Sequence, residues 1–357
     1  MSHPALSLYQ RDPQRLRRQT IQMDLMMKLQ KYLLLLVLIT FSQTLYALEE
    51  KQFCIYDPIG KNGPAVTFFS DLEAKAIRWG LTLKLVPYTD EKIASNDFKS
   101  GLCDMVFLTA ILGLPYVPFG GTLGVIGGIE NTKQLNILTK SLTNPKLNNY
   151  LINGNYEVAG VLPIGAVYMF VNDRTIDTVA EFSGKKMSVL NAAPQAYMMA
   201  SMVGASPVGT SLATFSGQFN NGVIDLLPMV ALSYSAFELY RGLGDAGGIL
   251  DEKLFYGMME VISHKDRFEP DFGQKMRNYV LSRMKDIHKL VADAEFEIPS
   301  KYWIKTSDGT VQDLGHLKRN VRVALKEKGV LDPKALTLLW KIRCSVNPKH
   351  AECVTPE

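Results

Sequence analysis

The chain has 357 residues, of which 47% are hydrophobic and 21% charged, and its formal net charge is +4 at pH 7. Its basic excess lies before residue 48, and basic and acidic residues balance in the remainder. A neutral body without a stripe of lysine and arginine between aromatic residues excludes a nucleic-acid-binding function. Its length suffices for one large core or for two lobes of ordinary domain size.

The amino-terminal segment has the order of features found in a secretory signal. An apolar run over residues 32–41 follows two lysines. It precedes a cleavage-site pattern over residues 44–47, which ends in the small residue Ala47. A helix needs about 20 apolar residues to cross a hydrocarbon core, and this run is little more than half that length. The sequence therefore predicts a cleavable signal peptide over residues 1–47 and a soluble periplasmic protein. Met26 or Met27 is an alternative start, and an uncleaved short anchor is the alternative to cleavage.

The next segments alternate between strand and helix patterns. Residues 52–56 are apolar and aromatic and end at a turn that contains proline and glycine, as a short buried strand does. Pro64 opens a helix that Gly80 ends, because proline suits a first helical turn and glycine suits a C-terminal cap. A strand, a helix and a third strand are expected at residues 81–88, 90–101 and 103–108.

The same order recurs later in the chain. Residues 157–172 are rich in β-forming residues and predict a crossover strand. Residues 98–104 and 219–225 both read Phe-x-x-Gly-x-x-Asp and lead into an apolar pair. This repeat indicates two similar lobes, and a chance likeness of two helix-to-strand junctions is the alternative. Strand, helix, strand, helix and strand patterns are expected at residues 186–190, 197–204, 206–208, 212–221 and 224–227.

Alternating strands and helices predict parallel sheets with right-handed crossovers. We therefore expect an α/β fold of two small open sheets joined by crossover strands, with a return link over residues 254–263. Amphipathic helices over residues 271–290 and 314–328 are expected to brace the hinge. The predicted divisions are a signal peptide (1–47), a first lobe (48–155), a second lobe (156–235), a return to the first lobe with the hinge (236–270), and C-terminal helices with a disulfide loop (271–357).

Four cysteines follow the predicted signal, and an exported protein keeps such residues oxidised. Cys344 and Cys353 would close a short loop, while Cys54 and Cys103 fall on segments predicted to be neighbouring strands. Two disulfides are therefore expected. A metal site is disfavoured because the chain has no Cys-x-x-Cys and because His350 has no partner at ligand spacing.

The sequence contains no convincing catalytic constellation and no cofactor site. Residues 204–209 come near a nucleophile elbow, but the second glycine is one position late and Pro207 disrupts the turn. The glycine-rich residues 120–128 lack the Lys-Ser/Thr of a phosphate-binding loop, and they predict a flexible or closely packed loop instead. The chain is therefore not expected to be an enzyme.

The strand ends of the two predicted lobes should face one crevice, which is where open α/β sheets bind ligands. Polar residues after the strands could fix a ligand, and aromatic residues could form apolar walls. For each candidate, loop solvation or core packing is the alternative. The expected ligand-binding residues are Asp57, Ile59, Lys61, Asn62, Tyr88, Thr109, Tyr168, Phe170, Asn191, Gln195, Thr210 and Met229.

Several segments resemble the substrate-binding subunits of tripartite ATP-independent periplasmic (TRAP) transporters. Residues 175–186, 203–208 and 221–225 resemble the family's stretch entering the second lobe and its later motifs. Residues 54–60 and 88–92 resemble, in particular, a little-characterised branch of its solute-binding proteins. The resemblance implies a two-lobed periplasmic binding protein of type II-like fold, which captures a solute and delivers it to integral membrane transporter subunits.

The resemblance also marks one departure. The family usually places an arginine after a Gly-x-Lys turn to grip a ligand carboxylate, and this position is Ser188 here. Lys61, Lys185 or Lys186 could substitute only as a point charge, since lysine lacks the planar fork. Ser188 is counted among the expected ligand-binding residues. An organic acid and a neutral, hydroxylated or partly aromatic solute are both compatible with it.

The leading expectation is thus an exported solute-binding protein without a cofactor, whose partners are a small molecule and a membrane transporter. An exported enzyme that uses Asp57 and Asp225 as acid and base is one alternative. An accessory protein of another envelope transporter, whose cleft grips a partner segment, is the other.

Overall fold

The computed structural model describes residues 22–31 and 49–355. Residues 22–31 form a helix, in which the Lys28 ammonium lies 3.9 Å from the Asp24 carboxylate. The apolar run and the expected cleavage site after Ala47 lie outside the described residues, so the signal peptide stays a prediction. Among the helices that the structure describes, none has the length and apolar character needed to span a membrane.

One half of the sheet consists of three parallel strands in the order β2 (Leu81–Tyr88), β1 (Glu49–Tyr56) and β3 (Met105–Thr109). The helix α4 (Glu91–Ser100) connects β2 to β3. It ends at Gly101, whose φ of 84° is a left-handed conformation that glycine adopts without strain. The predicted order of the three strands and the helix between β2 and β3 are confirmed.

The predicted single helix between β1 and β2 was wrong, because the chain forms two short helices, α2 (Pro64–Phe69) and α3 (Leu72–Ile77). The break falls at Asp71, whose carboxylate accepts hydrogen bonds from the Tyr279 hydroxyl and the Arg283 guanidinium, each at 2.6 Å. These partners are distant in the sequence. A local sequence pattern could therefore not predict the contacts that hold the turn.

The other half of the sheet contains β6 (Lys186–Leu190) between β7 (Ser206–Thr210) and β8 (Leu226–Val230), parallel to both. The helix α8 (Pro194–Met202) connects β6 to β7, and α9 (Phe215–Asn220) connects β7 to β8. This half repeats the strand and helix order of the first, as the sequence predicts.

The repeated Phe-x-x-Gly-x-x-Asp motif occupies equivalent places in the two halves. Each motif glycine follows a helix and has positive φ, 84° at residue 101 and 70° at residue 222. The Asp104 carboxylate accepts a hydrogen bond from the Gln52 amide of β1 at 2.6 Å. The Asp225 carboxylate accepts one from the Lys186 amide of β6 at 2.9 Å. The glycine of the motif thus ends a helix, and its aspartate holds the first strand of the same half by a hydrogen bond.

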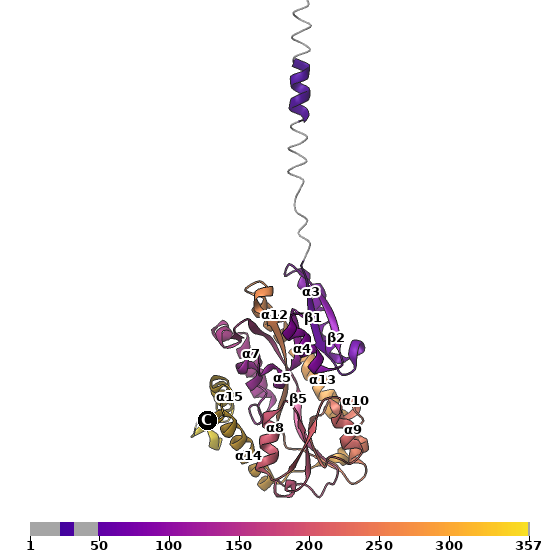
Figure 1. The fold of residues 1–357 in the computed structure, drawn as a ribbon. Coiled ribbons are helices and arrows are strands. Elements are labelled where there is room, and N and C mark those ends of the chain that lie inside the picture. Colours follow the sequence, from indigo (N-terminus) through magenta and orange to yellow (C-terminus); the bar gives the residue numbers. More distant parts are fainter. Residues whose placement is uncertain (1–21, 32–48, 356–357) are drawn as a thin grey trace, which may run out of the picture. The chain divides into compact units, whose positions relative to one another are not determined.

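Two long antiparallel strands, β5 (Tyr156–Val171) and β10 (Phe255–His264), join the halves. The strand order is β2-β1-β3-β10-β5-β8-β6-β7, so the two expected sheets are the two ends of one hydrogen-bonded sheet. Figure 1 shows β5 passing between the half that holds β1 and β2 and the half that holds α8 and α9. The crossover strand, the return strand and the two-lobed periplasmic binding fold are confirmed. The residue limits assigned to the lobes stay predictions.

The C-terminal helices differ from their predicted limits. The helix expected over residues 271–290 breaks at Arg283. The next helix starts well before residue 314, because the Ser307 hydroxyl accepts a hydrogen bond from the Thr310 amide and caps it. A further helix, which the sequence analysis missed, follows. The bounds are α12 (Phe272–Ser282), α13 (Met284–Glu297), α14 (Asp308–Glu327) and α15 (Pro333–Val346).

Apolar side chains pack on both faces of the sheet. On one face, Phe69 packs edge-on against Phe53 and Phe107, with ring centroids 4.8 and 5.0 Å apart. The remaining helices and strands of the described chain are α5 (Ala110–Gly113), α6 (Pro118–Thr122), α7 (Thr132–Leu142), β4 (Ile152–Asn153), α10 (Ser233–Ala236), α11 (Tyr240–Leu243), β9 (Gly248–Leu250) and β11 (Trp303–Ile304).

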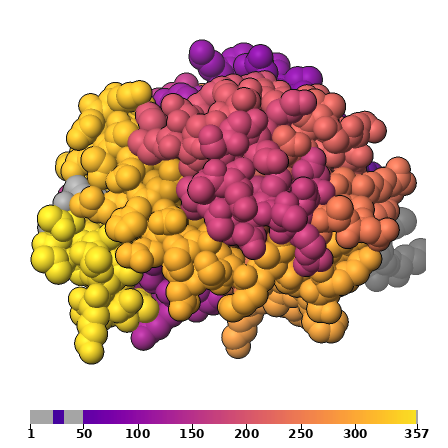
Figure 2. Space-filling view, turned by 90° about the horizontal axis from the view of Figure 1, so that it is seen from below, coloured from indigo at the N-terminus to yellow at the C-terminus, as the bar shows by residue number. Residues whose placement is uncertain are grey.

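Both predicted disulfides are present. Cys54 and Cys103 join β1 to the segment before β3, with their Cα atoms 5.9 Å apart. Cys344 and Cys353 join α15 to the C-terminal turn, with their Cα atoms 5.6 Å apart. Figure 2 shows the C-terminal segment, in yellow, at one edge of the face that it draws.

Candidate functional site

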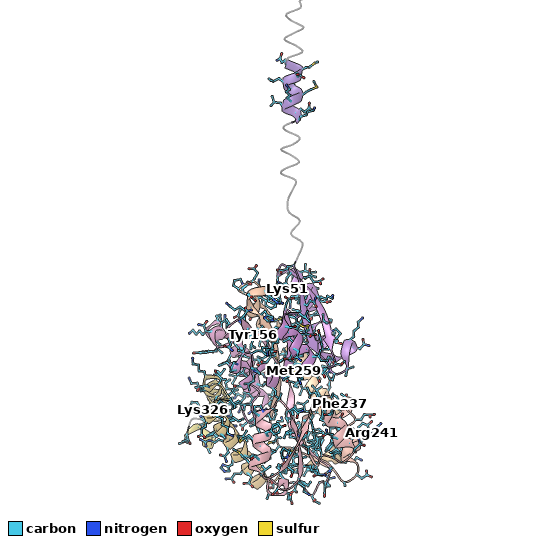
Figure 3. All side chains as sticks on the ribbon, viewed as in Figure 1. Lys51, Tyr156, Phe237, Arg241, Met259 and Lys326 are labelled. Atoms are coloured by element: carbon cyan, nitrogen blue, oxygen red, sulfur yellow. A yellow bond between two sulfur atoms is a disulfide. The ribbon has the colours of Figure 1, made fainter. Side chains whose placement is uncertain are left out.

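A first cavity, of about 220 Å³, lies between the two halves at the carboxyl ends of their strands. Thr109 at the end of β3 and Met229 in β8 line it from opposite halves, and the crossover strands contribute Ile164 and Met259. Figure 3 labels Met259 together with Phe237, which lines the same cavity from the end of α10.

Two smaller cavities continue the first. A second cavity of about 120 Å³ and a third of about 50 Å³ lie on the side of α8. The second and third share Leu190, Gln195 and Met229. We call the three cavities together the central cleft. The residues common to the first and second cavities are Thr109, Ile164, Leu212, Met229 and Val230.

About half of the expected ligand-binding residues line the central cleft. Apart from Ser188, which lies within β6 and was named through the resemblance, they lie near the ends of strands in both halves and at the start of α8, as the strand-end argument predicted. Their contact with a ligand stays a prediction. These residues are Asp57, Ile59, Thr109, Ser188, Gln195 and Met229.

The other expected residues lie outside the cleft lining. The Tyr88 hydroxyl donates to Asp97 at 2.7 Å, and the Tyr168 hydroxyl donates to Glu295 at 2.8 Å. Phe170 is fully buried in the core. Thr210 is also buried, whereas Lys61, Asn62 and Asn191 are exposed on the surface.

Asp57 is the acidic residue of the cleft wall, and it is fully buried. Its carboxylate accepts hydrogen bonds from the amides of Ile59, Ala65 and Val66 at 3.0, 2.7 and 3.3 Å. A Cβ atom on Gly63 would come within 1.9 Å of it, so only glycine allows this approach. The carboxylate therefore fixes the turn between β1 and α2 and is already engaged within the protein.

Ser188 faces the third cavity from β6 and is buried. Its hydroxyl lies 3.0 Å from the Thr210 hydroxyl, which in turn donates to the Val189 carbonyl at 3.2 Å. Since Thr210 uses its hydrogen on this carbonyl, Ser188 is the donor to Thr210. The position where the resemblance implied an arginine thus holds an internally satisfied hydroxyl pair without positive charge.

Gln195 in α8 bridges the two halves across the central cleft. Its side-chain oxygen accepts a hydrogen bond from the Ile126 amide at 2.8 Å, and its nitrogen donates to the Gly124 carbonyl at 3.5 Å. Both partners belong to the glycine-rich segment, residues 120–128. One side chain therefore links the wall of the second half to the wall of the first.

Replacing Gln195 with alanine is expected to favour an open arrangement of the halves. The lost hydrogen bonds are worth about 1 kcal/mol, which would weaken solute binding about fivefold if the bridge forms only in the closed state. Hydrogen–deuterium exchange should be faster at the Ile126 amide in Gln195→Ala. Tyr197→Phe, on the exposed side of the same helix, is the control. Unchanged protection at Ile126 in the alanine variant would contradict the bridge.

The glycine-rich segment is closely packed, which was one of its two predicted states. A Cβ atom on Gly121 would come within 2.5 Å of the Leu114 backbone. The Gly127 amide also donates to the Leu254 carbonyl at 2.9 Å. The glycines therefore serve close packing, and Gly121, Gly124 and Val125 form part of the cleft wall.

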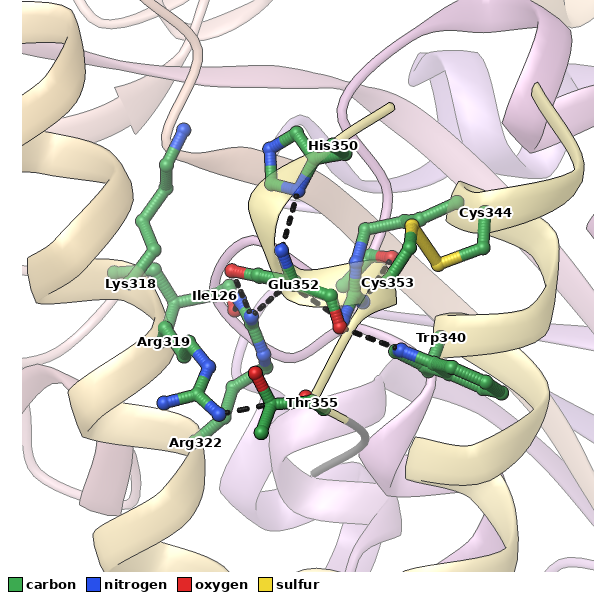
Figure 4. A network of polar contacts seen from close by, with 12 residues as sticks. Ile126, Lys318, Arg319, Arg322, Trp340, Cys344, His350, Glu352, Cys353 and Thr355 are labelled. Carbon is green, nitrogen blue, oxygen red and sulfur yellow. Dashed lines mark hydrogen bonds and ion pairs between the residues drawn. A yellow bond between two sulfur atoms is a disulfide. The ribbon is translucent and has the colours of Figure 1, made fainter. Parts of the chain in front are cut away.

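Two buried arginines hold the glycine-rich segment from the side of the C-terminal helices (Figure 4). Arg322 donates to the Ile126 carbonyl at 3.0 Å, and Arg343 donates to the Gly128 carbonyl at 3.1 Å. Glu352 in the C-terminal turn pairs with both guanidinium groups, at 2.8 and 3.0 Å. The C-terminal turn is thereby coupled to a wall of the central cleft.

Glu91 at the start of α4 lies behind the cleft wall. Its buried carboxylate accepts a hydrogen bond from the amide of Thr109, a lining residue. Burial raises the pKa of Glu91 to about 7, although the hydrogen bonds from Thr109 act in the opposite direction. Glu91 therefore titrates near neutral pH and supports the position of Thr109 from outside the cleft.

Sequence reasoning missed the apolar part of the cleft. The helix α13 contributes Ile287, Leu290 and Val291 to the first cavity. Their i, i+3 and i+4 spacing was a usable signal, but the same spacing describes ordinary packing against a core. Leu290 remains 42% exposed and Ile59 remains 56% exposed beside the cavity.

Comparisons with known proteins agree with this geometry. The model of the family "Solute-binding protein AdeT 1/2" matches residues 69–357. The "Probable solute-binding protein AdeT1" of Acinetobacter baumannii is 35% identical over 299 residues, which cover 84% of this chain and 98% of the relative. The "Probable solute-binding protein AdeT2" of the same organism is 26% identical over 234 residues, which cover 66% and 98%.

Solved structures share the fold at low sequence identity. A TRAP periplasmic solute-binding protein from Desulfovibrio salexigens with bound orotic acid has a TM-score of 0.69 and 11% identity, covering 83% of this chain and 99% of its own. The periplasmic ectoine-binding protein of the TeaABC TRAP transporter of Halomonas elongata has a TM-score of 0.67 and 12% identity, covering 84% and 100%. The chain therefore belongs to the AdeT 1/2 family of solute-binding proteins and has the fold of TRAP periplasmic solute-binding proteins.

Proposed function

We propose that this protein is exported, captures a small molecule in the central cleft and delivers it to an integral membrane transporter of the TRAP type. The observation that carries the proposal is the cleft itself, which lies between two similar halves that β5, β10 and the C-terminal helices connect. A solute that contacts both halves stabilises their closed arrangement. The names of the relatives and the ligands in the titles of the structural neighbours support capture of a small molecule.

The geometry gives little support to the alternative of an exported enzyme. Asp57 and Asp225 were the candidate acid and base, but only Asp57 lines the cleft. Asp225 precedes β8, at the opposite end of the strand from the cleft, and accepts hydrogen bonds from Lys186 and Asn172. Within residues 22–31 and 49–355, no group of His, Cys, Asp and Glu could hold a metal ion.

A thermal-shift screen of the purified protein tests solute capture. Organic acids, sugars, amino acids and aromatic compounds are added separately, and we expect one class to raise the melting temperature in a saturable manner. The matched control is Leu212→Trp, because Leu212 lines the two largest parts of the cleft and is partly exposed, so a larger ring there blocks the cleft. The shift should disappear in this variant.

Three results would contradict the proposal or part of it. Turnover of the stabilising compound would identify an enzyme. A screen without any stabilising compound would favour the accessory-protein alternative, in which the cleft grips a segment of another protein. A mature amino terminus well before Leu48 would contradict the predicted cleavage and, with it, the expected route of export.

A further inference from the structure

The central cleft presents almost no charge to a solute. Of the described residues that line its three cavities, none is a lysine or an arginine, and Asp57 is the acidic one. The first cavity is instead surrounded by aromatic, aliphatic and methionine side chains. Phe68, Phe107, Phe215, Phe237, Leu162, Leu232 and Met259 are among them.

The polar groups in the lining are largely occupied by the protein. The Asp57 carboxylate accepts from three backbone amides, the Ser188 hydroxyl donates to Thr210, and the Gln195 amide bridges to the glycine-rich segment. The Thr109 hydroxyl accepts a hydrogen bond from the Leu112 amide at 3.4 Å, and the Ser233 hydroxyl also lies in the lining. A bound solute therefore meets an apolar wall with a few hydroxyl groups.

An anionic solute would lose its hydration in this cleft without gaining an opposite charge. Removing an ionised carboxylate from water is costly unless a cation or several hydrogen-bond donors replace the water. A cationic solute would face Asp57, whose oxygens already accept hydrogen bonds from the start of α2. No cationic side chain in the described lining matches an anionic solute, and Asp57 is fully buried and already hydrogen-bonded, whereas apolar surface gains free energy when it is buried.

We propose that the central cleft selects an uncharged, largely apolar solute, such as a compact aromatic alcohol or amide. Cavities of about 220 and 120 Å³ with a common wall accommodate one or two rings. A single hydroxyl or amide on the solute would bond to the hydroxyl of Ser233, which lines the first cavity. This inference rests on the proposed function and assigns a substrate class to it.

Matched pairs of compounds test the substrate class. Indole-3-ethanol is compared with indole-3-acetate, and benzyl alcohol with benzoate, by isothermal titration of the wild-type protein at neutral pH. The alcohol of each pair should bind at least about tenfold more tightly than the acid. Tighter binding of the acids would overturn the substrate class and leave solute capture intact. If neither these compounds nor any member of the wider screen bound, both proposals would fail.

A substitution that places a charge in the cleft provides a second test of the substrate class. Met229 lines all three cavities, and Met229→Lys keeps an unbranched chain of similar length while adding an ammonium group. In a folded Met229→Lys protein the preference should move toward indole-3-acetate, whereas Met229→Leu should retain the alcohol preference. An acid preference in Met229→Leu would overturn the inference. If circular dichroism shows that Met229→Lys is unfolded, the comparison of alcohols with acids in the wild-type protein tests the substrate class by itself.

Discussion

Replacing Glu352 with alanine is expected to lower the free energy of unfolding by about 3–5 kcal/mol, because it removes the carboxylate that pairs with two buried guanidinium groups. Arg322 and Arg343 are each 1% exposed and share this carboxylate. The Trp340 indole donates to the Glu352 carbonyl at 2.9 Å, so its fluorescence reports on the site. Urea denaturation followed by this signal measures the loss.

The controls for Glu352 separate its buried charge from general effects. Glu352→Gln keeps the shape and removes the charge, so it should also destabilise the protein, although less than alanine. Glu327→Ala, at the exposed end of α14, should change the free energy of unfolding by less than about 0.5 kcal/mol. If Glu352→Ala were as mild as Glu327→Ala, the buried network would not stabilise the fold.

The same variant should also weaken solute binding. Arg322 and Arg343 donate to carbonyl groups of the glycine-rich segment, which lines the second cavity. A guanidinium group that loses its carboxylate partner holds this segment less firmly. We therefore expect a weaker thermal shift with the solute in Glu352→Ala than in Glu327→Ala.

Replacing Glu260 with glutamine is expected to stabilise the protein at alkaline pH and to flatten its pH dependence. Glu260 lies in β10 and is fully buried, and neither carboxylate oxygen has a hydrogen-bond partner within the described part of the chain. Gly113 and Gly120 pack closely against this carboxylate. A Cβ atom on Gly113 would lie 2.2 Å from one carboxylate oxygen, and a Cβ atom on Gly120 would lie 2.6 Å from the other. Burial therefore raises the pKa of Glu260 well above its ordinary value.

The sign of the pH effect follows from proton linkage. Above the ordinary pKa of about 4.5, the unfolded chain releases the Glu260 proton while the folded protein keeps it. Stability therefore falls as the pH rises, by about 1.4 kcal/mol per pH unit for one proton, until the raised folded pKa is reached. Glu91, with its pKa raised to about 7, adds a loss of the same sign between about pH 4.5 and about pH 7.

Urea denaturation of the wild type, Glu260→Gln and a control variant between about pH 5 and about pH 8 measures this effect. The slope of stability against pH should be smaller in Glu260→Gln than in the wild type. Glu73→Gln removes an exposed carboxyl from α3 and should leave the slope unchanged. Parallel pH profiles for the wild type and Glu260→Gln would contradict a protonated, buried Glu260.

The sequence predicted the strands because each depends on a local pattern, and the Cys54–Cys103 disulfide followed from the expected adjacency of two of these strands. Period-two and continuous apolar runs marked β1, β2, β6 and β5, and Gly101 and Gly222 ended helices where a left-handed residue was needed. The Phe-x-x-Gly-x-x-Asp repeat was the most informative signal. Its acidic residue proved to pin a neighbouring strand, which explains the repetition without a catalytic role.

The features that the sequence did not reveal depend on contacts between distant segments. The break between α2 and α3 is held by residues of α12 and the turn after it. The apolar lining of the cleft from α13 required knowing which face of that helix meets the first half. Strand-end reasoning located Asp57 and the family resemblance singled out Ser188, but neither could show that their hydrogen bonds are used inside the protein.

The distance between the two halves, with and without a solute, shows whether the halves close on a bound molecule. The described cysteines are all in disulfides, so spin labels attach selectively to cysteines introduced at the exposed positions Lys99 in α4 and Ser201 in α8. Double electron–electron resonance is recorded with indole-3-ethanol at a concentration that saturates its thermal shift. With the solute we expect a shorter mean distance and a narrower distribution, and no change when Leu212→Trp blocks the cleft. An unchanged distribution in the unblocked protein would contradict capture by closure of the two halves.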